Sequence, residues 1–157
     1  MCDWGHHLPS ADVFVLNRGI HFKDSAPSEF SRTLEEMTRR LGSRPYSIVY
    51  RSNKLPIPDC WRASGPKDAV DSFAISSVNP EWGWPKLQQQ DQMMRRILPR
   101  SSIFLNVSLL SFLRPDGGMP REGGTTDCVH SCLPGHVDDW NMLLIWALQD
   151  TARKDAT

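Results

Sequence analysis

Short apolar runs rich in β-branched and aromatic residues alternate along this chain with segments that repeat at the helical period. The runs 11–17 (ADVFVLN), 46–51 (YSIVYR) and 101–110 (SSIFLNVSLL) have the composition of buried strands. Strands that alternate with helices usually form a mostly parallel sheet with helices packed on its faces. The pattern therefore predicts a three-layer α/β sandwich.

Three segments between and after these runs are predicted to be helices. The first begins at the N-cap candidate Ser28, carries apolar residues every three or four positions, and ends at Gly42. The second, 87–98, stops before Pro99, and the third, 137–152, closes the chain. Three strands are few for a doubly wound sheet, so we expect further N-terminal strands outside this sequence.

Length and charge narrow the class of protein. At 157 residues the chain is predicted to be a single domain, 1–157, with a long aperiodic loop at 52–85. Its 18 Lys and Arg balance 18 Asp and Glu and are scattered, so no nucleic-acid partner is expected. Residues 1–8 are polar, and no apolar run is long enough for a membrane segment. A gene product that starts inside a longer protein would look the same, and we favour that interpretation.

The segment 127–135 (DCVHSCLPG) is the strongest candidate for chemistry, and we expect it to be a loop that presents side chains. A carboxylate at Asp127, three residues before His130, can hold the imidazole in one tautomer, as a general base requires. From spacing alone, a surface loop with a capping aspartate is an equally good interpretation.

Two other interpretations use the cysteines of the same segment. Four soft or borderline metal ligands fall within nine positions, which makes zinc an alternative: Cys128, His130, Cys132 and His136. Structural zinc sites usually combine two separated ligand pairs, which weighs against it. Alternatively, Cys128 and Cys132 form disulfides with Cys60 or Cys2, which would indicate an oxidising compartment.

The segment 127–144 (DCVHSCLPGHVDDWNMLL) resembles the DCxHxCLPGPxDxWN closing motif of the PC-esterase proteins, which include plant trichome-birefringence-like polysaccharide O-acetyltransferases. Upstream, 12–22 (DVFVLNRGIHF) is similar to the family's DVLVLNRGxHF stretch, and 113–118 (LRPDGG) is similar to its LRPDGH. Further similarity at 49–60 and 79–84 extends the resemblance over essentially the whole chain.

The resemblance implies an SGNH-like fold and a Ser-His-Asp mechanism. In that mechanism His130 is the base and Asp127 orients it. Asn17 and Gly19 match a turn that would stabilise the oxyanion, and His21 matches a position near substrate, although a satisfied histidine at a strand end is as good an interpretation. The disulfide candidates are Cys60, Cys128 and Cys132.

This sequence also departs from the family pattern. It has no Gly-Asp-Ser motif, and Ser10 does not lie in such a turn. The family's histidine in its P-x-H stretch is replaced by 55–58 (LPIP), and a proline after CLPG is His136 here. The substrate contacts of both segments are therefore expected to differ.

Three functional hypotheses follow. The first is an O-acyl transferase or esterase that acts on a glycan hydroxyl, with its serine outside this sequence, an unknown acyl donor and no cofactor or resident metal. The second is a carbohydrate-binding remnant without catalysis, and the third is a zinc-stabilised binding module. The resemblance implies the secretory pathway, in the Golgi lumen or membrane, for the parent protein.

Overall fold

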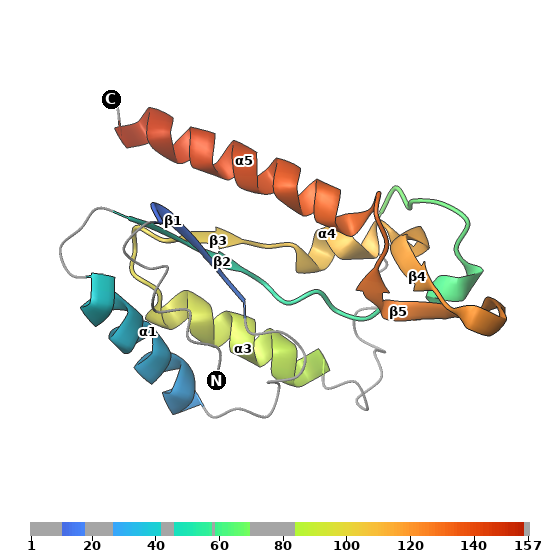
Figure 1. The fold of residues 1–157 in the computed structure, drawn as a ribbon, viewed down its shortest axis with the longest axis horizontal. Helices are drawn as coiled ribbons and strands as arrows, with labels where there is room; N and C mark the ends of the chain where they lie inside the picture. The colour runs from blue at the N-terminus through green and yellow to red at the C-terminus, as the bar shows by residue number, and fades with distance from the viewer. Residues whose placement is uncertain (1–10, 18–26, 42–45, 58, 70–83, 156–157) are drawn as a thin grey trace.

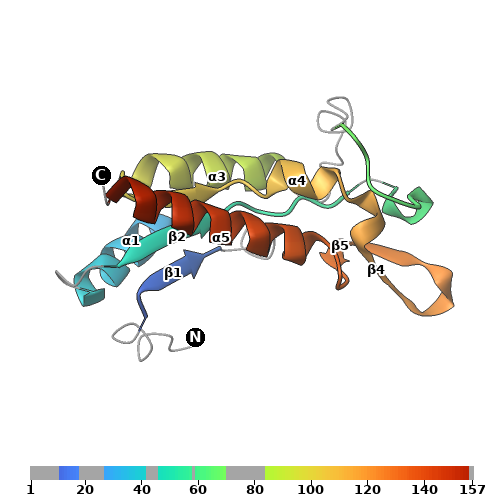
Figure 2. The same cartoon turned by 90° about the horizontal axis from the view of Figure 1, so that it is seen from above.

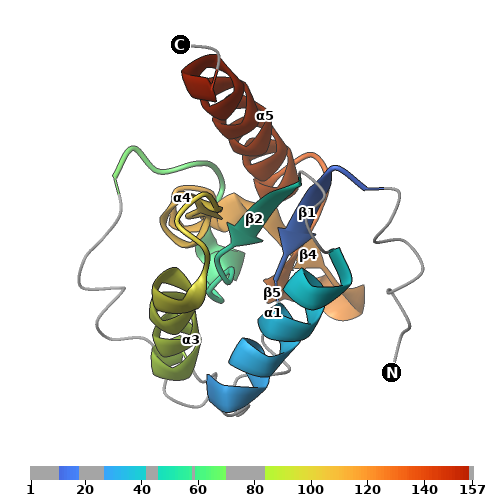
Figure 3. The same cartoon turned by 90° about the vertical axis from the view of Figure 1, so that its left-hand side faces the viewer.

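A three-stranded parallel sheet forms the centre of the molecule. The computed structural model describes residues 11–17, 27–41, 46–57, 59–69 and 84–155. Strands β1 (Val13–Leu16), β2 (Ser47–Arg51) and β3 (Ile103–Leu105) pair in the order β1-β2-β3. Helices α1 (Pro27–Leu41) and α3 (Trp84–Ile97) lie on one face of the sheet, and α5 (His136–Asp155) lies on the other (Figures 1 and 3). The predicted three-layer α/β sandwich is confirmed.

The central strand β2 is apolar on both faces because a helix layer covers each of them. Ile48 and Tyr50 point to one side and pack with Met94 of α3. Val49 points to the other side, where it packs with Leu105 and the inner face of α5. This pattern is typical of a strand inside a parallel sheet, where both faces are withdrawn from water.

Strand β1 lies at the edge of the described sheet. Its alternate residues Val13 and Val15 are 38% and 48% exposed, on the same side of the sheet as Val49. Within the part of the chain that the structure describes, no strand pairs with the outer edge of β1. In that same part, no helix is both long and apolar enough to cross a membrane.

The predicted strand 101–110 is wrong in its second half. β3 ends at Leu105, and the chain then turns into α4 (Ser108–Phe112). The backbone N–H groups of Val107 and Ser108 donate to the Ser52 hydroxyl, which holds the start of this helix against the end of β2. A short apolar run fits a strand or a buried helix equally well, so the long-range bonds to Ser52 decided the outcome.

A small antiparallel sheet replaces the loop that was expected around the DCVHSC segment. It consists of β4 (Gly118–Pro120) and β5 (Thr126–Ser131), and both Figure 1 and Figure 2 show it beyond one end of the parallel sheet. The turn between the two strands uses Gly123 and Gly124 at φ 80° and 75°, where a side chain would be strained. The strands were not predicted because their residues show no alternation of apolar and polar types.

Three short 3-10 helices complete the described structure: η3 (Cys60–Arg62), η5 (Pro115–Gly117) and η6 (Glu122–Gly124). The long loop predicted at 52–85 contains η3, and α3 begins at its end, at Trp84, three residues before the predicted start of that helix. Residues 70–83 of this loop lie outside the described residues.

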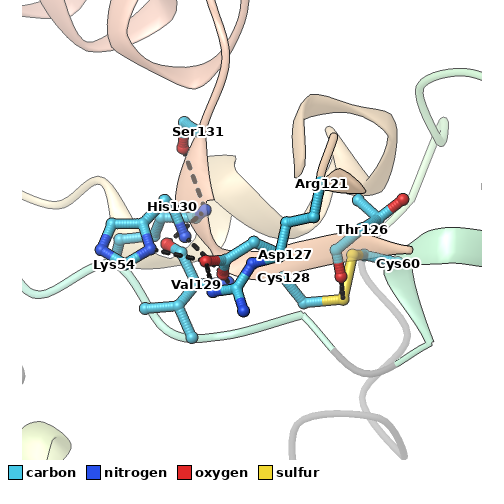
Figure 4. The surroundings of a disulfide bond; sticks show 9 residues. All are labelled: Lys54, Cys60, Arg121, Thr126, Asp127, Cys128, Val129, His130 and Ser131. Carbon is cyan, nitrogen blue, oxygen red and sulfur yellow. Dashed lines mark hydrogen bonds and ion pairs between the residues drawn. A yellow bond between two sulfur atoms is a disulfide. The ribbon is translucent and has the colours of Figure 1, made fainter. Parts of the chain in front are cut away.

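A disulfide between Cys60 and Cys128 joins η3 to β5 (Figure 4). The two cysteines are 68 residues apart in the sequence, and nearby the Ile57 N–H donates to the Cys128 carbonyl at 3.2 Å. This confirms two of the disulfide candidates. Cys132 has no disulfide partner among the described residues, and Cys2 lies outside them. The cross-link ties the small sheet to the segment that follows β2.

Replacing both Cys60 and Cys128 by Ser should lower the free energy of unfolding by about 4 kcal/mol, because a closed loop of this length restricts the unfolded chain. Urea unfolding followed by circular dichroism measures the change. Cys132→Ser is the matched control and should cost about 1 kcal/mol or less. An unfolding midpoint that does not change when the wild type is reduced would contradict the prediction.

Candidate active site

The irregular pairing of β5 creates the geometry of the site. Met119 pairs with Asp127, whereas the adjacent Gly118 pairs with Ser131, so one step along β4 corresponds to four along β5. The residues between, 128–130, therefore bulge out of the ladder. The bulge turns the N–H groups of Val129 and His130 back toward the Asp127 carboxylate.

Asp127 is buried and accepts several hydrogen bonds. Its side chain is 5% exposed, and Oδ1 accepts the N–H of Val129 at 2.8 Å and that of His130 at 3.1 Å. Its Oδ2 lies 2.7 Å from His130 Nδ1 and also forms an ion pair with Arg121 (Figure 4). Asp127 thus lies between the imidazole and the guanidinium.

These partners keep the Asp127 carboxylate charged. Burial by itself raises the pKa of the carboxyl group, but the hydrogen bonds from His130, Arg121 and the two backbone amides together lower that pKa well below its usual range. An ionised carboxylate can only accept, so the Nδ1 of His130 must be the protonated ring nitrogen. In the neutral form of the ring, Nε2 is the nitrogen that carries the lone pair.

His130 is available to a second molecule because its side chain is 60% exposed. A ring fixed through Nδ1, with an exposed and unprotonated Nε2, is the arrangement of a general base oriented by a carboxylate. The structure brings together the two residues that the sequence assigned to this role, and their catalytic role remains a prediction.

Lys54 is a residue of this site that the sequence did not indicate. It lies three residues after β2, and its Nζ donates to the Val129 carbonyl at 2.8 Å and to Ser131 Oγ at 2.9 Å (Figure 4). Burial is the main cause that lowers the pKa of Lys54 to about 8, while the nearby Asp127 acts to raise it. No motif or spacing relates residue 54 to residues 129 and 131.

Asn17, proposed for the oxyanion turn, instead ties the ends of two strands together. Its Nδ2 donates to the Arg51 carbonyl at 2.8 Å and to Asn53 Oδ1 at 3.3 Å. Both amide hydrogens are used, so stabilising an oxyanion through Nδ2 would require one of these bonds to break. The oxyanion role of Asn17 stays a prediction, and its companions Gly19 and His21 lie outside the described residues.

A buried carboxylate holds Asn53 in place. Asp91 of α3 accepts hydrogen bonds from Asn53 N, from Asn53 Nδ2 and from the Tyr50 hydroxyl, at 2.9 to 3.1 Å. Burial outweighs these bonds and raises the pKa of Asp91 to about 6. This cluster was not predicted, because the partners of Asp91 lie 38 and 41 positions away in the sequence.

The zinc alternative does not fit the donor set. Cys128 is cross-linked to Cys60, and His136 is 1% exposed with its Nε2 bonded to the Ser111 carbonyl at 3.0 Å. Within the described ranges, no group of three or more His, Cys, Asp or Glu side chains could hold a metal ion. Of the two cysteine-based interpretations, the geometry supports the disulfide.

The sequence comparisons agree with an acyl-esterase-like α/β protein. Residues 73–147 match the PC-Esterase family, described as a GDSL/SGNH-like acyl-esterase family found in Pmr5 and Cas1p. This match supports the resemblance to that family that the motif at 127–144 indicated.

Several curated relatives are O-acetyltransferases by name. Xyloglucan O-acetyltransferase 2 of Arabidopsis thaliana is 22% identical over 90% of this chain and 45% of its own length. Xyloglucan O-acetyltransferase 4 of Populus trichocarpa is 43% identical over 57% of this chain and 24% of its own. Protein trichome birefringence-like 38 of Arabidopsis thaliana is 50% identical over 28% of this chain and 12% of its own. The chain thus spans less than half the length of these relatives, and no solved structure matches it.

We expect His136, which stands where the family has proline, to lower the free energy of unfolding in acid. Burial is the main cause that lowers the pKa of His136, the nearby charge of Lys54 lowers it further, and the hydrogen bond to the Ser111 carbonyl acts to raise it. The unfolded chain binds a proton near pH 6.5, and the folded chain binds it only at a lower pH. Unfolding free energy should therefore fall as the pH drops below about 6.5, by at most about 1.4 kcal/mol per pH unit.

His136→Gln keeps a donor for Ser111 and should remove this dependence, as measured by urea unfolding between pH 7 and 5. The raised pKa of Asp91 acts in the opposite direction in this range, and the lowered pKa of Asp127 acts only below about pH 4. The difference between the two proteins at each pH therefore isolates His136. Parallel stability curves for the two proteins would show that His136 is not the cause.

Proposed function

We propose that this chain provides the general-base half of an active site that transfers or hydrolyses an O-acyl group, most simply acetyl, on a polysaccharide hydroxyl. The 2.7 Å contact between Asp127 Oδ2 and the Nδ1 of an exposed His130 carries the proposal. Relatives named xyloglucan O-acetyltransferases support acetyl as the group and a polysaccharide as the acceptor.

In the proposed reaction, a serine hydroxyl gives its proton to His130 Nε2 while its oxygen attacks the carbonyl carbon of the acyl ester. The ester C–O bond then breaks, and Nε2 returns the proton to the leaving oxygen. A polysaccharide hydroxyl or water next attacks the acyl-serine, again losing its proton to Nε2; the bond between the acyl carbon and the serine oxygen then breaks, and Nε2 returns the proton to the serine oxygen. Asp127 stabilises the imidazolium formed in each half-reaction.

The serine of this mechanism is taken from outside the given sequence, which contains no Gly-Asp-Ser motif. The family description, GDSL/SGNH-like acyl esterase, supports a serine of that kind. The Cys60–Cys128 disulfide supports the secretory pathway as the compartment, because disulfides persist in oxidising surroundings.

Release of acetate from acetylated xyloglucan by the full transcript-encoded protein tests the proposal. His130→Ala should lower kcat/KM by about 10³-fold or more, and Asp127→Asn should lower it comparably because the wrong tautomer becomes available. His136→Gln, which alters a buried histidine outside the pair, should keep the activity at pH 7.5. Circular dichroism would verify that each variant folds.

The outcome also separates the enzyme from the carbohydrate-binding alternative. Saturable binding of xyloglucan oligosaccharides in calorimetry, with no acetate release by wild type, would favour a binding remnant. Acetate release that survives His130→Ala would exclude His130 as the base.

A further inference from the structure

Among the described residues, three links connect the segment after β2 with the bulge in β5. Two of them, the disulfide from Cys60 and the hydrogen bond from Ile57 N–H, hold Cys128 alone. The third is Lys54, whose ammonium reaches past Cys128 to the Val129 carbonyl and Ser131 Oγ. Lys54 therefore holds the residues on either side of His130.

The position of Lys54 is energetically costly unless its bonds are formed. The ammonium is partly withdrawn from water, and hydrogen bonds from a charged donor offset this loss of hydration better than neutral ones. Removing the side chain would leave the Val129 carbonyl and Ser131 Oγ without this donor. The bulge would then keep its anchor at Cys128 and the backbone pairing of Ser131 with Gly118, but the bonds to the Val129 carbonyl and to Ser131 Oγ on either side of His130 would be lost.

We propose that Lys54 is a positioning residue for His130: its ammonium fixes Val129 and Ser131 so that the bulge presents Nε2 of His130 in one orientation. This inference rests on the proposed function for its catalytic consequence, although the fixation itself does not. A displacement of about 1 Å at a reacting group lowers a rate by about 10²-fold, which sets the expected size of the effect.

In this proposal, the protonated form of Lys54 holds the Val129 carbonyl and Ser131 Oγ. The titratable and charged groups around it are Asp127, Cys132 and His136, and Asp127 is in turn bonded to Arg121 and His130. Above about pH 8 the ammonium loses its proton, and its charge-assisted bonds become ordinary ones. The fixation should weaken over that range.

Lys54→Met and Lys54→Arg test the proposal, with Lys67→Met as a control at an exposed lysine. The first readout is hydrogen exchange of the Val129 and His130 amides, which donate to Asp127 only while the bulge is ordered. Lys54→Met should lower their protection at pH 6.5 by about tenfold or more. Lys54→Arg and Lys67→Met should keep that protection.

The second readout is acetate release by the full transcript-encoded protein as a function of pH. Lys54→Met should lower kcat by about 10²-fold with KM little changed. Wild type should lose activity above about pH 8, and Lys54→Arg should keep it to higher pH, a shift that a purely structural role would not produce. Cys132→Ser should leave the loss near pH 8 in place, which excludes the thiol as its source.

The outcomes distinguish the two proposals. If exchange at Val129 and His130 depends on Lys54 while no protein releases acetate, the positioning role stands and the proposed function fails. If acetate release depends on His130 but neither kcat nor exchange changes in Lys54→Met, the proposed function stands and the role of Lys54 is refuted. Thermal unfolding of each variant verifies that it folds.

Discussion

A buried negative charge on Asp127 organises the region around the candidate site. A carboxylate withdrawn from water is unfavourable unless donors surround it, and the backbone donors here are the Val129 and His130 amides of the bulge. In the bulge, two backbone amides donate to Oδ1 of Asp127, and Oδ2 is bonded to His130 and Arg121. The orientation of the imidazole is thus a consequence of satisfying the carboxylate.

The parallel sheet supplies the rigid support for this arrangement. β2 is buried on both faces, and the residues that follow it run directly to the small sheet through Lys54, Ile57 and Cys60. Beside them, Asn53 is fixed by Asp91 and in turn binds Asn17 at the end of β1. Sites in open α/β sheets lie beyond the carboxyl ends of the strands, and the bulge of β5 occupies that place.

Local patterns and the family motif were sufficient to predict the layers and to single out the two residues of the candidate site. Apolar runs located β1 and β2, helical spacing located α3 and α5 within a few residues, and the family motif singled out Asp127 and His130. The second half of the run 101–110 was wrong because its composition suits strand and helix alike. Lys54 and the Asp91 cluster depend on partners 38 to 77 positions apart in sequence, and no local pattern encodes such pairings.

The protonation of the His130 ring tests the central claim most directly. Long-range ¹H–¹⁵N correlation of the imidazole at pH 7.5 distinguishes a nitrogen that carries a proton from one that carries a lone pair. A buried, ionised Asp127 predicts a protonated Nδ1 and an unprotonated Nε2, and it predicts that Asp127→Asn removes this preference. A ring protonated at Nε2 in the wild type would contradict the account, because His130 could then neither bond to Asp127 as described nor accept a proton from a hydroxyl.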